Sequence, residues 1–303
     1  MSTVVDEVDN GRKTSTWISD FKQLTKIGLS MSVVFSSVAG YLLAVEPEAI
    51  SIYTIFLLAI GGYFMVGASN AFNQIVERNT DALMKRTKNR PIPAGRMSVR
   101  TAMAIAVAFT VFGIFILYSI NPKSAFFGAI SIFLYTSVYT PLKPVTPLCV
   151  FVGAFPGAIP FMLGWVAATN NFGMEAGFLF LIQFFWQFPH FWAIGWLQDE
   201  EYKKAGFNML PMGKKDNGAV RQIILYTILM ILVSVSPVLK LTGSFCIHPV
   251  TAVLILFLGL SMLYYAVKML KDHSREMARK LMLSSVLYIT VVQVIYVIDK
   301  FLH

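Results

Sequence analysis

The sequence predicts an all-α membrane protein in which nine helices span the bilayer. Two observations predict this class. Hydrophobic residues make up 56% of the 303 positions and charged residues only 14%, and the mean hydropathy is +0.65. Long, nearly uncharged stretches also recur, and each approaches the ~20 residues that a helix needs to cross the hydrocarbon core. We place the spans at residues 22–45, 50–73, 100–120, 124–142, 147–168, 175–197, 221–240, 247–269 and 280–299.

The distribution of lysine and arginine predicts a cytoplasmic N-terminus. With that orientation, 22 of the 25 lysines and arginines fall on the cytoplasmic side, and Lys123, Lys240 and Lys300 fall on the other side. Cytoplasmic loops of multi-pass membrane proteins carry such an excess of positive charge. The net charge of +9 is therefore a topology signal, and it gives no reason to expect a nucleic-acid partner.

The chain divides into a flexible cytoplasmic tail at residues 1–20 and a single transmembrane domain at residues 21–303. The tail is polar and contains no apolar run of the kind found in signal peptides. Lys26 follows it, where the first span enters the membrane. Its ammonium group either extends to the lipid headgroups or contacts a bound phosphate. Cys149 and Cys246 fall near opposite ends of different spans and indicate neither a disulfide nor a metal site.

The second span ends in an acidic motif. Asn73, Glu77 and Asp81 recur at i, i+4 and i+8, so on a helix they share one face. Mg²⁺ prefers oxygen ligands, and it usually takes one or two carboxylates while phosphates and water complete its shell. We interpret these three residues as a magnesium site.

Two arginines, Arg86 and Arg90, follow in a loop dense in Arg, Pro and Gly. Their planar guanidinium groups suit a phosphate, which they can bind through two parallel hydrogen bonds. A simpler alternative is a solvated collar at the membrane surface, in which charges pair from i to i+4. Amides that begin inside the apolar run, where they are costly, favour a functional site over a collar.

The fourth and fifth spans contribute a proline-rich inner loop and a distorted helix. Three closely spaced prolines, Pro141, Pro144 and Pro147, end the fourth span and place Tyr139 and Lys143 near the cytoplasmic face. Lys143 is either a positive-inside anchor or a cation that faces a phosphate. The interior of the fifth span holds Pro156, Pro160 and three glycines, which a membrane helix tolerates when it packs in protein or beside a cavity. This pattern favours a ligand chamber.

The sixth span combines aromatic residues with a histidine and ends in acids. His190 lies within the span and Trp186 precedes it by one turn. Such a histidine is commonly a hydrogen-bonded core residue, but the surrounding aromatic side chains also suit a large planar ligand. Asp199, Glu200 and Glu201 follow on the cytoplasmic side, with Lys203 behind them. Two acidic clusters on one side would form a two-sided clamp for magnesium and a diphosphate.

Five motifs in order resemble the intramembrane (UbiA-type) prenyltransferases, and most closely the members that farnesylate haem. The motifs are R-T-K-N-R-P-I-P-A-G-R-M, Y-T-P-L-K-P-V-T-P, G-A-F-P-G-A-I-P-F-M-L-G-W, W-Q-F-P-H-F-W and Y-K-K-A-G-F-N-M-L-P. The resemblance extends from about residue 20 to residue 298. Where the family usually has Asp at the middle acidic position, this chain has Glu77.

The resemblance implies a helical bundle around a central chamber in a bacterial inner membrane. It implies transfer of a farnesyl group from farnesyl diphosphate to the 2-vinyl group of haem b, with Mg²⁺ as cofactor and addition of water, giving haem o. A haem a synthase is a candidate downstream partner. We expect catalytic or metal-binding roles for Asn73, Glu77, Asp81, Asp199 and Glu200, and substrate binding by Lys26, Arg86, Arg90, Tyr139, Lys143, Trp186, His190 and Lys203.

Two other functions remain open from the sequence. The first is prenyl transfer to a phenolic or quinone precursor, against which the aromatic setting of His190 argues. The second is transport, for which broken polar helices near the middle of the membrane would be expected. The polar clusters of this chain crowd one face instead, which disfavours a transporter.

Overall fold

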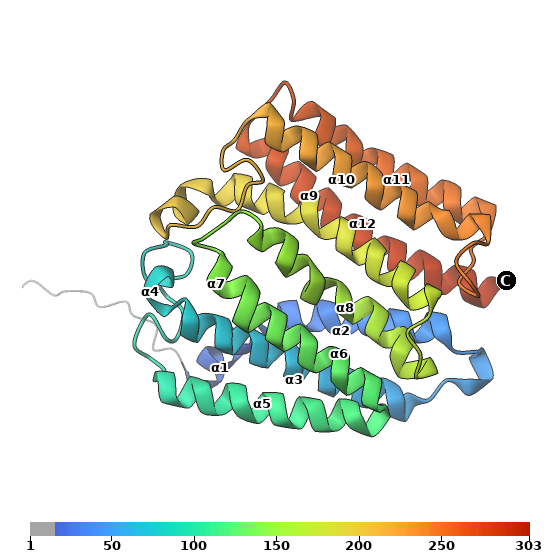
Figure 1. The fold of residues 1–303 in the computed structure, drawn as a ribbon, viewed down its shortest axis with the longest axis horizontal. Coiled ribbons are helices and arrows are strands. Elements are labelled where there is room, and N and C mark those ends of the chain that lie inside the picture. The colour runs from blue at the N-terminus through green and yellow to red at the C-terminus, as the bar shows by residue number, and fades with distance from the viewer. Residues whose placement is uncertain (1–15) are drawn as a thin grey trace, which may run out of the picture.

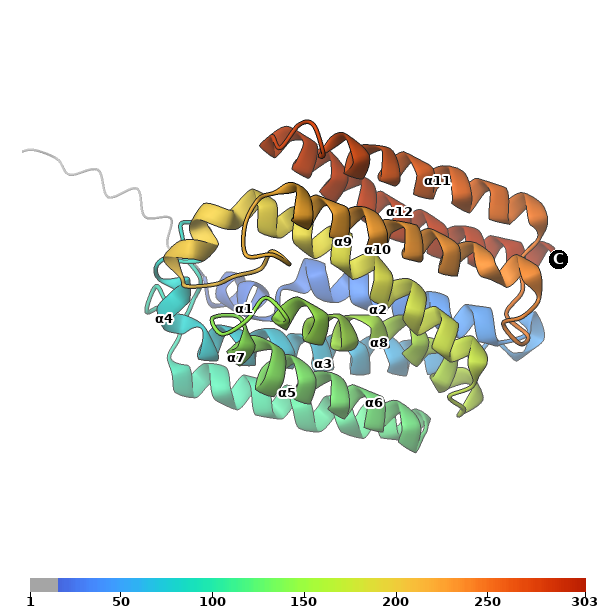
Figure 2. The same cartoon turned by 45° about the horizontal axis from the view of Figure 1, so that its top comes forward.

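The computed structural model describes residues 16–303, so most of the predicted tail lies outside the described residues. Helix α1 begins at Trp17, inside the range 1–20 that we predicted to be flexible. The described part is helical and contains no strand, and the long helices run side by side (Figures 1 and 2). The prediction of an all-α protein is confirmed. The helices are α1 (Trp17–Thr25), α2 (Ile27–Ala44), α3 (Ile52–Val76), α4 (Arg78–Asp81), α5 (Val99–Ile120), α6 (Pro122–Phe133), α7 (Thr140–Leu142), α8 (Cys149–Thr169), α9 (Met174–Lys204), α10 (Asn217–Val235), α11 (Pro249–Lys268) and α12 (Arg275–Leu302).

Three shorter elements complete the order. They are the 3₁₀-helices η1 (Pro47–Ala49) and η3 (Ser236–Leu239) and the π-helix η2 (Leu134–Tyr139). Because η2 continues α6 into α7, residues Pro122–Leu142 form one span-length segment. The predicted short span at 124–142 corresponds to this segment.

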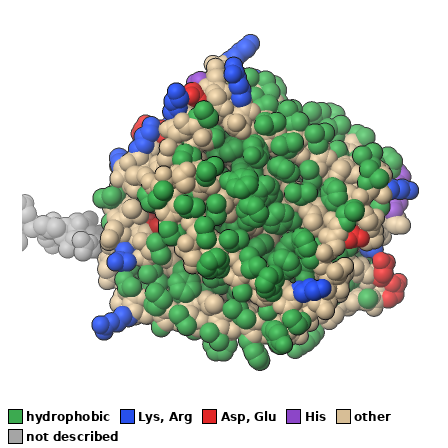
Figure 3. All heavy atoms as spheres, in the orientation of Figure 1, with side chains coloured by type: hydrophobic (Ala, Val, Ile, Leu, Met, Phe, Trp, Pro, Cys, Tyr) green, Lys and Arg blue, Asp and Glu red, His purple; other side chains and the backbone are tan. Residues whose placement is uncertain are grey.

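Within residues 16–303, eight helical segments are long and apolar enough to cross a membrane. They match eight of the predicted spans. The remaining prediction, 175–197, falls on the 31-residue α9, which is long enough to cross but less apolar. Gln183, Gln187 and His190 lower its mean hydropathy. The count of nine and the cytoplasmic N-terminus therefore stay predictions, whereas a multi-pass membrane protein is shown. In the view of Figure 3, hydrophobic side chains cover the centre of the face, as a lipid-facing surface requires.

Side-chain caps determine where several helices begin. Ser51, Ser98, Asn121 and Ser274 each accept a hydrogen bond from the backbone N–H three residues later. Each cap satisfies a backbone donor at the first turn of its helix that has no partner within the helix. The caps explain two boundaries that hydropathy misplaced. Helix α6 begins at residue 122 instead of 124, and α12 begins at residue 275 instead of 280.

Helix α8 forms the centre of the bundle, between α2, α6 and α9 (Figure 1). It is the most buried of the eight apolar helices in the described chain. Its close approach to α2 requires glycine on both helices. A Cβ on Gly164 would lie 1.9 Å from the Ser37 carbonyl oxygen, and one on Gly40 would lie 2.0 Å from the Phe161 carbonyl oxygen. The thin, proline-containing helix is thus packed in protein, as its sequence predicted.

Candidate active site

A cavity of about 550 Å³ lies inside the bundle and ends at the loops around α4 and α7. Its volume is typical of a small-molecule site. One end is charged and is formed by the loops around α4 and α7. The remainder is formed by α2, α3, α8, α9 and α12, and is mostly apolar and aromatic. The charged side chains that line the cavity are Lys26, Glu77, Asp81, Arg86, Arg90 and Lys143.

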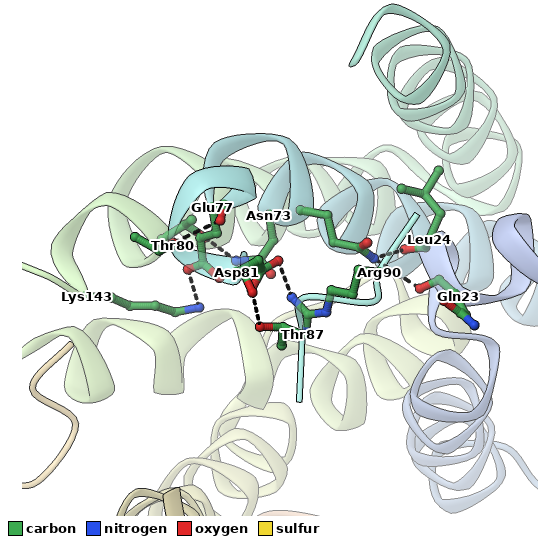
Figure 4. A network of polar contacts seen from close by, with 11 residues as sticks. Gln23, Leu24, Asn73, Glu77, Thr80, Asp81, Thr87, Arg90 and Lys143 are labelled. Carbon is green, nitrogen blue, oxygen red and sulfur yellow. Dashed lines mark hydrogen bonds and ion pairs between the residues drawn. The ribbon is translucent and has the colours of Figure 1, made fainter. Parts of the chain in front are cut away.

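The two acids of the first motif are buried, and each is paired with a cation that lies beyond the next helical turn (Figure 4). Asp81 Oδ2 lies 2.6 Å from a guanidinium nitrogen of Arg90, and Glu77 Oε1 lies 2.6 Å from Lys143 Nζ. Both carboxyl groups are almost completely shielded from solvent. The collar alternative, with pairs from i to i+4, is therefore wrong. Lys143 is likewise buried against Glu77 and does not extend to the lipid headgroups.

At this end of the cavity, burial and ion pairing shift the pKa of each charged side chain in opposite directions. Burial raises the pKa of Asp81, although the Arg90 guanidinium and a bond from Thr87 act against that shift. Burial alone would lower the pKa of Lys143, but the Glu77 carboxylate outweighs it and the net pKa is raised. Lys143 therefore stays a cation, while the Asp81 carboxylate depends on a nearby positive charge.

Asn73 is held by Thr140 at the start of α7, and not by the acids. Its Nδ2 donates to Thr140 Oγ1 at 3.3 Å, and that hydroxyl donates to the Tyr135 carbonyl at 2.7 Å. The π-helix η2 turns Tyr135 and Tyr139 towards the cavity. Lys143 Nζ lies 4.6 Å from the centre of the Tyr139 ring, a cation–π contact. Asn73, Tyr139 and Lys143, which are far apart in sequence, thus meet at one end of the cavity.

Lys26 occupies a break between α1 and α2 that hydropathy did not reveal. Its backbone is left-handed, with φ 47°, and buried amides hold the carbonyls before it. Asn70 Nδ2 donates to the Thr25 carbonyl, and Gln74 Nε2 donates to those of Gln23 and Leu24. Asn70 and Gln74 belong to the amides whose burial in an apolar run favoured a functional site. Their hydrogen bonds stabilise the break between α1 and α2 that brings Lys26 to the cavity.

Burial and the nearby cations Arg90 and Lys143 lower the pKa of Lys26 to about 7. A bound diphosphate would restore its proton. We therefore expect affinity for farnesyl diphosphate to fall as the pH rises above about 7, by up to about tenfold per pH unit, because binding must then take up a proton. Below pH 7 the lysine is already charged and its contribution is complete. Dissociation constants measured from pH 6.5 to 9 test this.

Lys26→Arg is the matched variant, since a guanidinium stays protonated throughout that range. Its affinity is expected to lose the slope. Equal slopes in the two proteins would show that Lys26 does not carry the pH dependence.

The loop after α4 presents its two arginines differently. Arg86 is exposed and lines the cavity, whereas Arg90 is mostly buried against Asp81. Thr87 anchors the loop by donating to the Asp81 carbonyl at 2.8 Å. Arg96 pairs with Asp20 of α1 at 2.9 Å, so its role in the structure is to hold the loop to the N-terminal helix.

The second acidic cluster lies at the same end of the molecule but outside the cavity lining. Asp199 pairs with Lys203 at 2.9 Å, and Glu200 is exposed. Glu201 accepts a 2.6 Å hydrogen bond from the backbone N–H of Lys85, which joins α9 to the loop that carries the arginines. None of these four side chains is among those that line the cavity. The structure thus brings Asn73, Glu77 and Asp81 together but does not add Asp199, Glu200 or Lys203 to them.

Among the described residues, no three histidine, cysteine, aspartate or glutamate side chains form a group that could hold a metal ion. Glu77 and Asp81 provide two carboxylates. The magnesium roles of Asp199 and Glu200 stay predictions, as does the binding role of Lys203. Two carboxylates nevertheless suffice for Mg²⁺ when substrate phosphates supply the other oxygens.

Trp186 and His190 line the apolar part of the cavity from α9. Their rings stack with centroids 4.7 Å apart and planes 17° from parallel. His190 Nδ1 lies 2.8 Å from Ser285 Oγ on α12, and Trp186 Nε1 donates to the Ser285 carbonyl at 2.6 Å. His190 is thus hydrogen-bonded to another helix and lines the cavity as well. Nothing in the sequence around Ser285 indicated this role.

Buried amides also meet in the middle of the cavity. Gln293 of α12 donates to Gln183 Oε1 of α9 and accepts from Ser36 of α2, both at 3.1 Å. Gln187 donates to the Ala154 carbonyl at 2.8 Å, where Gly157 leaves room for its side chain. Amides within apolar spans were the available signal, because they are costly in a membrane unless paired.

Comparison with known proteins identifies relatives whose sequence similarity extends over nearly the whole chain. Residues 33–290 match the UbiA prenyltransferase family. A protein named protoheme IX farnesyltransferase from Christiangramia forsetii is 64% identical, over 94% of this chain and 95% of the relative. Its namesake from Flavobacterium psychrophilum is 63% identical over the same shares. A third, from Koribacter versatilis, is 31% identical over 93% of this chain and 94% of the relative.

Solved structures of low sequence identity share the fold. A structure described as digeranylgeranylglyceryl phosphate synthase has a TM-score of 0.77 and 18% identity, over 94% of this chain and 99% of that one. A UbiA homologue from Archaeoglobus fulgidus, bound to GPP and Mg²⁺, has a TM-score of 0.63 and 15% identity, over 92% and 99%. The helical bundle around the cavity is therefore the fold of these proteins.

Proposed function

This chain belongs to the UbiA prenyltransferase family, and we propose that it transfers a farnesyl group from farnesyl diphosphate to the 2-vinyl group of haem b. Water adds in the same reaction, so that the products are haem o and diphosphate. The identity of 64% with a protoheme IX farnesyltransferase, over nearly the full length of both chains, supports this choice of substrates.

A single observation of the structure supports the reaction type: one cavity joins a charged end to an apolar, aromatic interior. Lys26, Arg86, Arg90 and Lys143 gather positive charge at that end, opposite two carboxylates. A diphosphate with an attached hydrocarbon tail needs a charged region for the phosphates and an apolar region for the tail. Arginine is suited to grip phosphate oxygens in pairs, and lysine contributes a compact charge.

The cations at the charged end would assist the departure of the leaving group. As the bond between farnesyl C1 and oxygen breaks, the electron pair leaves with the diphosphate. Positive side chains held in place stabilise that growing negative charge without having to reorganise. Arg90 and Lys143 are already positioned by Asp81 and Glu77 at 2.6 Å, so the charge of this end exists before the substrate arrives.

The acidic motif fits a magnesium ion. Asp81 Oδ1 is buried and has no hydrogen-bond partner among the described residues, so one oxygen of the motif is available. Asp81, Glu77 and Asn73 would hold the ion, with substrate phosphates and water as its other ligands. When bound, it would supply further neutralisation of the diphosphate. The magnesium-bound neighbour from Archaeoglobus fulgidus supports this assignment.

The apolar part of the cavity would shield the allylic cation. The terminal carbon of the vinyl group attacks farnesyl C1, and the positive charge then lies on the vinyl carbon attached to the porphyrin. Water binds that carbon and loses a proton, which leaves a hydroxyethylfarnesyl side chain. Aromatic walls such as Trp186 and Tyr135 exclude other nucleophiles from the cation.

The decisive assay uses purified full-length chain with farnesyl diphosphate, Mg²⁺ and either haem b or 4-hydroxybenzoate. We expect mass spectrometry to detect haem o and released diphosphate in the first reaction alone. Prenylated 4-hydroxybenzoate without haem o would instead assign the chain to a phenolic substrate. A bacterial inner membrane location follows from the same proposal, and a haem a synthase partner stays a prediction.

A further inference from the structure

The hydrogen bonds around His190 determine which ring nitrogen carries the proton. Ser285 Oγ donates its single proton to the Met282 carbonyl at 2.6 Å. Its 2.8 Å contact with His190 Nδ1 must therefore be donated by the imidazole. Nδ1 carries the hydrogen in the neutral ring, and Nε2 carries the lone pair.

His190 Nε2 has no hydrogen-bond partner among residues 16–303, although its ring is half-buried and lines the cavity. The orientation of the ring is fixed from two sides. Trp186 stacks against it at 4.7 Å, and Trp186 is itself bound to the Ser285 carbonyl. An imidazole that donates from one nitrogen to a fixed acceptor, and offers the other nitrogen to a cavity, has the arrangement typical of metal-binding histidines.

We propose that His190 Nε2 is the axial ligand of the iron of the metalloporphyrin substrate. This inference rests on the proposed function, because haem b is the acceptor in that reaction. Neutral imidazole is a common axial ligand of haem iron. Trp186 and Ser285 are positioning residues, which keep the lone pair aimed at the cavity.

Ligation would determine which part of the porphyrin faces the charged end. A bond from Nε2 to iron fixes the porphyrin plane relative to α9, and the walls of the cavity limit rotation of the ring within that plane. One edge, with its vinyl group, can then be held against the allylic carbon. Such orientation of two reactants accelerates a reaction between them and selects one of two similar groups.

The test begins with spectroscopy of the purified full-length chain titrated with haem b. The wild-type protein is expected to show electron paramagnetic resonance of histidine-ligated ferric iron and, after reduction, an iron–histidine stretch in the resonance Raman spectrum. His190→Gln should lose both signals and bind haem at least about tenfold more weakly. His190→Gly should regain the signals when imidazole is added.

His273→Gln is the matched control. His273 lies in the inner loop outside the cavity lining, where its Nε2 contacts Asn217 Oδ1 at 2.9 Å. This variant should keep the wild-type spectrum and activity. Ser285→Ala should keep a ligated iron but shift the iron–histidine stretch, because the imidazole loses its hydrogen-bond acceptor. That shift would not arise from a purely structural role of Ser285.

Two results would overturn the inference. A His190→Gln protein with an unchanged spectrum and activity would leave His190 a structural residue. Unchanged spectrum with lost activity and an altered pH profile would make it a proton acceptor for the added water. Both results require a wild-type protein that makes haem o. If the wild-type protein makes none, the proposed function itself fails, and the two failures are thereby distinguished.

Discussion

Asp81→Asn is expected to lower the rate of haem o formation on the order of 10²–10³-fold while the protein remains folded. The substitution preserves the size of the side chain but removes the negative charge that pairs with Arg90 at 2.6 Å. It also exchanges a carboxylate oxygen, Oδ1, which has no partner in the described chain, for a weaker ligand or a donor. Steady-state rates at saturating haem b, over a range of Mg²⁺ concentrations, measure the effect.

Asp272→Asn is the matched control for Asp81→Asn. Asp272 is exposed in the loop between α11 and α12, where its Oδ1 accepts a hydrogen bond from the backbone N–H of Ser274. It should retain the wild-type rate and magnesium dependence. Thermal unfolding of both variants separates lost chemistry from lost structure. If Asp81→Asn turned over at the wild-type rate, or the wild-type protein were fully active in excess chelator, the magnesium assignment would be wrong.

Arg90→Lys is expected to lower kcat by about 10²-fold, although the charge is preserved. The guanidinium engages Asp81 through one nitrogen and has further N–H groups for phosphate oxygens, whereas an ammonium is a single point. A contact that strengthens as the diphosphate departs affects kcat more than KM. Initial rates measured over a range of farnesyl diphosphate concentrations give kcat and KM separately.

Arg100→Lys provides the comparison for Arg90→Lys. Arg100 is exposed at the start of α5 and lies outside the cavity lining. Its substitution should change neither constant. Unaltered kcat and KM in Arg90→Lys would reduce Arg90 to a structural partner of Asp81. A rise in KM at constant kcat would indicate binding without assistance to the leaving group.

The sequence alone predicted the helical class and most helix positions. Hydropathy is a property of consecutive residues, and a bilayer admits few backbone structures besides helices. It also predicted the acidic motif, because Asn73, Glu77 and Asp81 belong to consecutive turns and their shared face follows from helix geometry. The boundaries near 122 and 275 differed because side-chain caps, and not hydropathy, begin those helices.

The pairs that build the site were decided by the tertiary structure. Glu77 meets Lys143 and His190 meets Ser285 across 66 and 95 residues of chain. Asp199, predicted for the same site, turns towards Lys203 instead. Which face of a helix meets which neighbour depends on its rotation and on close contacts such as that between Gly40 and Gly164. Those contacts depend on segments far apart in the chain. The spacing of residues within one helix shows which of them share a face, but not which neighbour that face packs against.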